Sequence, residues 1–565
     1  MVFLGAVGAI PGLVLGMLFA QLLFFLNPDL HFSTPAMIRA AAYFGLPSAA
    51  LSAGSLLLLS RSSRRRGLRL LAWLLTLALC LAGALSWVLP SYFAYYLPPG
   101  INTRLIKAAV WITAGAVVSF YTSLLHTLYR RRYGWRSRCG LAMCVLVAFW
   151  TMAERRGAYQ PAQEPFEDPG LRERTGHSRL VVVGLDGASL DAILPLAERG
   201  ALPFLARVLE GGSHGHLRSL RPLRKGAAWT SLATGKLPYK HGVLSSRSYT
   251  VPALRRGEEI KLIPPFEPFR EWAQLGGSFR LVDGAERRSL AVWEILSGLE
   301  LNAAVVGWPL TDPFGPARLA GLSEAFFRGA DAGGTARPDG LRSIGLAVGA
   351  EAPTPPPAGV PAELLQAWSG DRWRFEVARQ WLIAEPGCRA MFLVAPGLRT
   401  VSLRTFGGYS AVQFDGSSRP HQLAAAAAFT AYYTALDSLL SELWRVQTGP
   451  AVLAIVSAHG AGAPTGWARL RAELSDVHSV RGYFRDAPDG VLLLYGDGIA
   501  AGARIDGGFV VDVVPTLMYA LGLPVARDFD GRVLRQAFTP TYLAGHPLSF
   551  VRSFEALRVA DFPSH

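Results

Sequence analysis

Hydrophobic residues are concentrated at the start of the chain. Charged residues are almost absent from the first sixty positions, whereas from about Glu154 onward they recur at the density of a soluble protein. A helix needs roughly 20 apolar residues to cross the hydrocarbon core of a bilayer, so the apolar runs predict about five membrane-spanning helices. These segments are Val2–Leu26, Pro35–Leu59, Leu70–Leu89, Ile106–Leu128 and Cys139–Met152. The last is short, which leaves a four-span alternative open.

The distribution of arginine predicts the orientation in the membrane. Five arginines lie between Arg61 and Arg69 and five more between Arg130 and Arg138, whereas the loops Asn27–Thr34 and Trp87–Thr103 contain no lysine or arginine. Arginine-rich loops remain in the cytoplasm. The N-terminus is therefore predicted to be cytoplasmic, and five crossings leave the C-terminal part extracytoplasmic. Four crossings would reverse the side of the C-terminal part.

The formal net charge of +15 is interpreted as surface solubility together with the arginines that fix the membrane topology. Binding to nucleic acid would require basic residues interleaved with aromatic residues on one face, but the densest basic runs separate apolar segments. We therefore expect the bilayer, and no nucleic acid, as a partner. Of the four cysteines only Cys388 lies in the polar part of the chain, so no disulfide forms within that part.

Composition divides the chain into four regions. Residues 1–155 form the membrane region, and residues 156–178, which contain three prolines, form a linker. Residues 179–540 form an α/β domain, in which residues 329–361 are rich in Gly, Ala and Pro and are interpreted as a loop or cap insertion. Residues 541–565 form a C-terminal tail.

The α/β prediction begins with the first polar segment. Arg179–Leu185 is short, β-branched and apolar, which is typical of a buried parallel strand. Asp186-Gly187 ends the strand, and Ser189–Arg199 follows as a predicted helix. Open α/β sheets place their functional sites at the carboxyl ends of the strands, so Asp186 is a candidate site residue.

Further segments follow in a characteristic order. They are Ala227-Ala228-Trp229-Thr230-Ser231-Leu232-Ala233-Thr234-Gly235, Pro238-Tyr239-Lys240-His241-Gly242, Val292–Leu296, Val305–Thr311, Val452–Gly460, Pro488–Val491, Asp512–Leu517 and Asp530–Leu534. From Arg179 to Phe538 the chain resembles the alkaline phosphatase superfamily, and most closely its type I phosphodiesterase and nucleotide pyrophosphatase branch. The resemblance implies a mostly parallel central sheet with helices on both faces.

The resemblance also implies a site of two metal ions, held by three Asp and three His, beside a threonine nucleophile. It assigns the nucleophile to Thr230, at the start of a helix, and two metal ligands to Asp186 and His459. The His241 turn is common in the family and is interpreted as structural.

Four family ligand positions carry other residues in this chain. Ala458 precedes His459 where the family has Asp, Arg399 and Leu403 occupy the positions of an Asp and a His, and Phe484 replaces the last His. These residues cannot bind a divalent cation, so a two-metal site is not expected and at most one zinc or manganese ion remains. Nearby polar residues are interpreted as surface or structural. These are Asp415, His421, Asp476 and His478.

Arg399 has two interpretations. A guanidinium keeps positive charge where a metal ion stood and binds phosphate oxygens through paired N–H groups. In that case the pocket accepts a phosphate-containing small molecule or a phospholipid. In the alternative, Arg399 pairs with a local carboxylate.

Three functions therefore remain at the level of sequence. The first is a pseudoenzyme that keeps the fold and binds a phosphate-containing ligand or a partner protein. The second is an active, metal-dependent phosphodiesterase or phosphatase that uses Thr230. The third is a phospholipid head-group transferase of the phosphoethanolamine type, because those enzymes also join membrane helices to an extracytoplasmic domain of this superfamily.

Overall fold

The fold is described from a computed structural model of the chain. The described residues are 2–59, 64–153, 178–312, 314, 319–329, 335–351, 355–356, 358–410, 419–463, 482–484 and 487–557. The chain forms two compact units. Residues 1–160 and 244–282 belong to the first unit, and residues 161–243 and 283–565 to the second.

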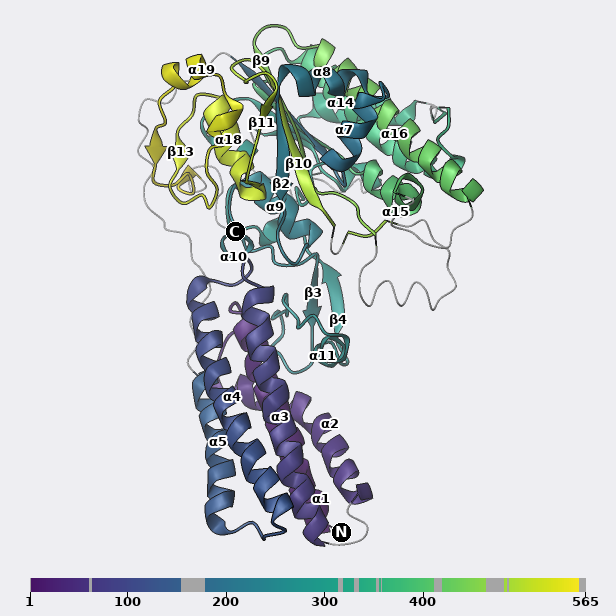
Figure 1. Ribbon diagram of the computed structural model, residues 1–565. Coiled ribbons are helices and arrows are strands. Elements are labelled where there is room, and N and C mark those ends of the chain that lie inside the picture. Colours follow the sequence, from purple (N-terminus) through teal and green to yellow (C-terminus); the bar gives the residue numbers. More distant parts are fainter. Residues whose placement is uncertain are drawn as a thin grey trace. The chain divides into compact units, whose positions relative to one another are not determined.

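The first unit contains the apolar helices. Their bounds are α1 (Val2–Leu26), α2 (Thr34–Leu59), α3 (Arg64–Tyr92), α4 (Pro99–Leu128) and α5 (Trp135–Ala153). Of these, α1 to α4 are long and apolar enough to cross a membrane. The shorter α5 begins with two arginines and packs against α4. The N-terminal bundle predicted from the sequence is therefore present (Figure 1).

The first unit also includes residues 244–282, which we call the inserted segment. It contains strands β3 (Arg247–Thr250) and β4 (Ser278–Leu281), which form an antiparallel pair, and helix α11 (Glu267–Ala273). Val251, Ile260 and Ile263 of the segment share one hydrophobic cluster with Phe19 and Phe44 of α1 and α2. Residues from the middle of the chain thus fold with the N-terminal helices.

Asn27 holds this segment through all the hydrogen-bonding groups of its amide. Its Nδ2 donates to the carbonyls of Leu23 at 2.9 Å and Leu262 at 2.8 Å. Its Oδ1 accepts from the backbone N–H groups of Lys261 at 2.7 Å and Leu262 at 2.8 Å. The side chain is buried, so each of these bonds replaces contact with water that burial has removed.

The second unit is built on a ten-stranded sheet. Its strand order is β11-β2-β10-β9-β1-β8-β5-β6-β7, with β12 paired to β2. Pairing is parallel throughout the β9-β1-β8-β5-β6 run and antiparallel around β10 and β7. The strands are β1 (Arg179–Leu185), β2 (Ser213–Arg218), β5 (Ala303–Val306), β6 (Ala320–Leu322), β7 (Ala336–Arg337), β8 (Ala390–Ala395), β9 (Ala451–His459), β10 (Asp489–Gly496), β11 (Ala503–Arg504) and β12 (Gly508–Phe509).

Helices cover both faces of this sheet, as the fold prediction requires (Figure 1). Val181, Val183 and Leu185 of β1 face a core formed with α7, α8, α14, α15 and α16. On the other face, Gly184 leaves room for the ring of Trp229 in α9, since a Cβ atom at Gly184 would lie 2.6 Å from it. The helices are α7 (Leu190–Glu198), α8 (Pro203–Gly211), α9 (Lys225–Thr234), α10 (Pro238–His241), α12 (Val292–Gly298), α13 (Asp339–Ala350), α14 (Leu365–Ala384), α15 (Gly397–Tyr409), α16 (Arg419–Arg445), α18 (Val513–Ala520) and α19 (Pro540–Gly545).

Two regions contain more structure than the sequence indicated. Residues 329–361 include β7 and α13, which packs against α14. Residues 541–557 include most of α19 and strand β14 (Phe550–Val551), which pairs with β13 (Val525–Ala526). Short strands and Gly-rich helices carry weak periodic patterns, which explains why composition suggested loops here.

We expect Asn27→Ala to release the inserted segment. The substitution removes the side-chain partner of the part-buried Lys261 N–H and of the buried Leu262 N–H and carbonyl, and each buried group that loses its partner costs about 1–3 kcal/mol. Cleavage by trypsin after the exposed residues Arg255 and Arg256 should therefore accelerate several-fold in the detergent-solubilised full chain. The exposed Asn302→Ala serves as the control, and equal cleavage rates in the two variants would contradict the role given to Asn27.

Candidate functional site

Three neighbouring parallel strands bring the candidate residues together. Strands β9, β1 and β8 lie side by side in the sheet, so their carboxyl ends meet at one edge. His459 ends β9, Asp186 follows β1, and Arg399 lies in the first turn of α15 just after β8. The structure therefore places Asp186, His459 and Arg399 at one location.

Asp186 is the centre of this site, and its carboxylate is fully buried. Lys225 Nζ lies 3.0 Å from Asp186 Oδ2, and His459 Nε2 lies 3.3 Å from Asp186 Oδ1. Trp229 Nε1 donates to Oδ1 at 3.3 Å. Burial by itself would raise the pKa of the Asp186 carboxyl, but Lys225, His459 and Arg399 outweigh burial and hold that pKa well below its ordinary value. Asp186 is therefore an anion stabilised chiefly by the Lys225 ammonium.

Lys225 was not among the residues singled out from the sequence. It is the first residue of α9, whereas the sequence placed Thr230 at the helix start. Thr230 is instead one turn further into the helix, where its Oγ1 donates to the Gly226 carbonyl at 2.8 Å. The lysine could have been found from the sequence only by setting the helix boundary five residues earlier.

Arg399 packs against Phe484 rather than against a carboxylate. Its guanidinium carbon lies 4.5 Å from the centre of the Phe484 ring, and that ring contacts His459 edge-on at 5.0 Å. Gly187, beside Arg399 and Phe484, has a φ of +99°, a backbone conformation that residues with a side chain rarely adopt. Within the described part of the chain, no ion pair joins Arg399 to an acidic group at salt-bridge distance.

Asp371 fixes the start of α15 through hydrogen bonds to the backbone. The backbone N–H of Gly397 donates to both carboxylate oxygens of Asp371, at 2.9 and 3.1 Å, and the Tyr432 hydroxyl donates at 2.9 Å. Burial raises the pKa of Asp371 to about 6, against the opposing effect of Arg374. Gly397 precedes Arg399 by two residues. These bonds therefore fix the position of the Arg399 backbone and the starting point of its side chain.

The C-terminal end of α9 is also held by buried charges. Lys236 Nζ lies 2.7 Å from both Asp528 and Glu555, and the Leu237 N–H donates to Asp530 at 2.8 Å. His241 is buried beneath the helix, 3.0 Å from Ser231 Oγ, and burial lowers its pKa to about 3. His241 is therefore neutral, and its role is interpreted as structural. Asp528, Asp530 and Glu555, near the end of the described chain, help to position α9.

The described residues do not fit a two-metal centre. Catalytic zinc sites take three protein ligands for each ion, and no group of three or more His, Cys, Asp or Glu side chains capable of holding a metal occurs among the described residues. Asp186 and His459 provide two donors, and the Lys225 ammonium already occupies the position against Oδ2. A single ion would have to displace that ammonium.

The remaining predicted residues lie as follows. Leu403 is one turn beyond Arg399 in α15 and is 36% exposed, whereas Ala458 is buried in β9. Phe484 is buried and completes the cluster. Asp415, Asp476 and His478 lie outside the described residues, as does the side chain of His421.

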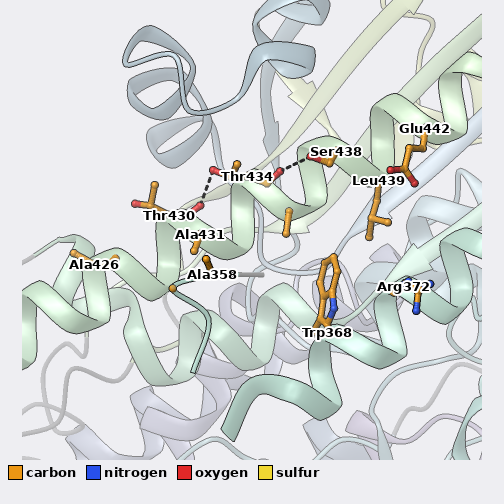
Figure 2. Close-up of a pocket in the computed structure, with 13 residues that line it drawn as sticks. Ala358, Trp368, Arg372, Ala426, Thr430, Ala431, Thr434, Ser438, Leu439 and Glu442 are labelled. Carbon is orange, nitrogen blue, oxygen red and sulfur yellow. Dashed lines mark hydrogen bonds between the residues drawn. The ribbon is translucent and has the colours of Figure 1, made fainter. Parts of the chain in front are cut away.

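A separate pocket of about 950 Å³ lies between α14 and α16. Figure 2 shows the small residues of α16 along one wall, with Trp368 and Arg372 of α14 opposite. Hydroxyl groups on α16 donate within the helix, from Thr434 to Thr430 and from Ser438 to Thr434. This pocket shares no residue with the Asp186 site.

Residues 180–474 match the sequence model of the family described as type I phosphodiesterase / nucleotide pyrophosphatase. The chain belongs to the type I phosphodiesterase / nucleotide pyrophosphatase family. It is thus a member of the alkaline phosphatase superfamily, as the sequence resemblance indicated. No curated protein matches the chain in sequence.

Several solved structures are similar to this family member. Phosphonoacetate hydrolase from Sinorhizobium meliloti 1021 is 17% identical, with a TM-score of 0.32 over 50% of this chain and 56% of that chain. Murine ectonucleotide pyrophosphatase / phosphodiesterase 5 is 11% identical, with a TM-score of 0.36 over 61% and 95%. An alkaline phosphatase PafA mutant is 12% identical, with a TM-score of 0.38 over 64% and 99%. The chain thus spans little more than half of the phosphonoacetate hydrolase.

We expect Lys225→Ala to destabilise the second unit of this family member in a pH-dependent manner. Removing one partner of a fully buried ion pair costs about 3–5 kcal/mol. The Lys225 side chain is 32% exposed, so a smaller loss of roughly 1–3 kcal/mol is expected. The measurement is the thermal unfolding midpoint of the detergent-solubilised full chain between pH 3 and pH 8.

The sign follows from the lowered pKa of Asp186, whose ordinary value is 3.8. A carboxyl with a lowered folded pKa contributes stability above its unfolded pKa and loses it as the pH falls through the folded pKa. The difference between wild type and Lys225→Ala should therefore be largest above about pH 5 and shrink below about pH 4. Lys225→Arg should recover most of the loss, and a difference independent of pH would contradict the ion-pair account.

Proposed function

We propose that this protein is a membrane-anchored, extracytoplasmic member of the phosphodiesterase family that binds a phosphate-containing ligand without two-metal hydrolysis. The observation that carries the proposal is the contact of 3.0 Å between Lys225 Nζ and Asp186 Oδ2. A cation of the chain thus lies where the family resemblance expects a metal ion. The proposed binding groups are Arg399 and Lys225.

The charges of the site favour an anionic ligand. Lys225 and Arg399 carry two positive charges beside the single negative charge of Asp186. Both cationic side chains are only partly buried, so a solute can reach them. The guanidinium presents paired N–H donors whose geometry matches two oxygens of a phosphate group, and the Phe484 ring limits the orientations of the guanidinium.

The state of Thr230 and the replaced ligand positions make efficient hydrolysis unfavourable. A threonine hydroxyl needs a base or a metal ion to act as a nucleophile, and the Thr230 hydroxyl donates instead to a carbonyl of its own helix. Four family ligand positions carry Arg399, Leu403, Ala458 and Phe484, none of which ligates a divalent ion. Loss of ligands removes both metal affinity and metal geometry.

The inserted segment supports an extracytoplasmic location for the α/β domain. It is bonded to Asn27 at the end of α1, and the loop that follows Asn27 has no lysine or arginine, whereas the arginine-rich loops lie at the opposite ends of the helices. The segment interrupts the α/β domain in the sequence. Covalent continuity therefore favours the domain on the side opposite the cytoplasmic loops, whether or not α5 crosses the membrane.

We expect Arg399→Ala to weaken phosphate binding. Hydrogen bonds to a charged group contribute about 1.5–3 kcal/mol, which corresponds to a loss of affinity of roughly 10-fold to 100-fold. Titration calorimetry with inorganic phosphate on the detergent-solubilised full chain measures this loss. Arg404→Ala, on the same helix, is the matched control, and unchanged affinity in Arg399→Ala would refute an anion site at Arg399.

The same preparation tests the alternatives. Metal content by mass spectrometry and turnover of bis(p-nitrophenyl) phosphate should both be negligible. One metal ion per chain, together with turnover that disappears in Thr230→Ala, would establish an active phosphodiesterase instead. Transfer of a head group from a supplied phospholipid would establish the transferase. Either result would overturn the proposal that the protein is a pseudoenzyme.

A further inference from the structure

The inserted segment packs on the membrane helices through aromatic side chains. Trp272 of α11 stacks on Phe19 of α1 with ring centres 4.1 Å apart, and Phe269 contacts the same ring at 5.9 Å. Trp272 also meets Phe44 of α2 edge-on at 6.3 Å. These contacts fix α11 against two helices that are long and apolar enough to span a membrane.

The positions of these contacts along α1 and α2 give the distance of α11 from the helix ends. Phe19 precedes Leu26, the last residue of α1, by seven residues, which is about 10 Å at 1.5 Å per residue. Phe44 follows the first residue of α2 by ten residues, or about 15 Å. Interfacial helices lie about 5–10 Å inside the boundary between head groups and acyl chains. The proposed function places α1 and α2 in the bilayer, and contacts this far from the helix ends hold α11 beside the spanning segments rather than in bulk water.

Part of the exposed surface of the segment is apolar, beside exposed charged residues such as Arg270 and Glu271. Phe266, Phe269, Trp272 and Leu275 recur every three residues, and the two outer members of this row, Phe266 and Leu275, are exposed. The row thus continues from the packed interface into an uncovered surface. On the adjacent hairpin, Phe279 is 55% exposed and Leu281 is also exposed. Figure 1 shows α11 next to the β3–β4 hairpin.

Cationic groups border this apolar surface. Arg247 of β3 lies 4.6 Å over the Phe279 ring. Arg270 and Arg280 are about half exposed, and they pair with Glu271 at 3.7 Å and Glu259 at 2.6 Å. Aromatic and aliphatic side chains flanked by arginine are the composition with which peripheral segments enter the head-group region. Phe266, Leu275, Phe279 and Leu281 are all exposed within one segment of sixteen residues that packs on apolar helices, and exposed apolar groups that gather in this way mark interaction sites.

We propose that the inserted segment is a lipid-contacting element, in which Phe266, Leu275, Phe279 and Leu281 enter the outer leaflet beside α1 and α2. The proposal rests on the membrane anchoring in the proposed function. It assigns residues in the middle of the α/β sequence to the bilayer surface. The occupant is the lipid itself, and a second copy of the chain or a soluble protein is the competing occupant.

Photocrosslinking in the full chain tests this proposal. The photoreactive analogue p-benzoylphenylalanine replaces Phe279, or Phe266, and the protein is reconstituted in nanodiscs of phosphatidylcholine and phosphatidylglycerol. Mass spectrometry after irradiation counts lipid adducts. Phe550 in the second unit is the matched control, because it is 54% exposed and also lies beside an arginine, Arg527. Trp111, an exposed residue of α4, is the positive control.

We expect lipid adducts at Phe279 and Phe266 at least five times more frequent than at Phe550. Adducts at Trp111 but only background adducts at Phe279 and Phe266 would refute the lipid contact while leaving the anchoring intact. Background adducts at Trp111 as well would refute the anchoring itself. Crosslinks from Phe279 to a second copy of the chain would also overturn the proposal, in favour of a protein interface.

Discussion

A carboxylate removed from water must be surrounded by positive charge or by hydrogen-bond donors, and Asp186 sets this requirement at the centre of the second unit. Lys225 meets it from α9, His459 from β9 and Trp229 from the helix face that covers β1. The arrangement depends on parallel pairing, because only parallel neighbours bring the ends of β9, β1 and β8 to one edge. The remaining packing holds these groups in place, from the buried Lys236 pairs to the Asp371 contact at Gly397.

In the proposed function, the site retains the fold of the phosphodiesterase family but takes its positive charge from Lys225 and Arg399. An ammonium and a guanidinium supply electrostatic attraction and N–H donors, but they cannot activate a hydroxyl in the manner of a bound metal ion. They do not depend on the supply of metal. Such groups suit recognition of a phosphate group better than its transfer, and the proposed function therefore separates binding from hydrolysis.

The first unit shows how a membrane region can include residues distant in the sequence. Asn27 terminates α1 and at the same time pairs with two backbone positions of the inserted segment. The stacked rings of Phe19 and Trp272 extend this contact along the helix. Because the segment interrupts the α/β sequence, the chain passes between the two units at three places. The membrane region and the α/β domain are therefore not simply consecutive.

The order of apolar runs and family motifs by itself determined the helical membrane region, the strand Arg179–Leu185 and the family, since these depend on local composition and linear spacing. Asp186, Arg399 and His459 were predicted as site residues in the same way, and the structure places them near one another. Only the tertiary structure placed Lys225 beside Asp186, Phe484 beneath Arg399 and Trp272 against Phe19. Such contacts join residues tens to hundreds of positions apart, and burial, charge pairing and ring packing between them leave no periodic pattern in the sequence.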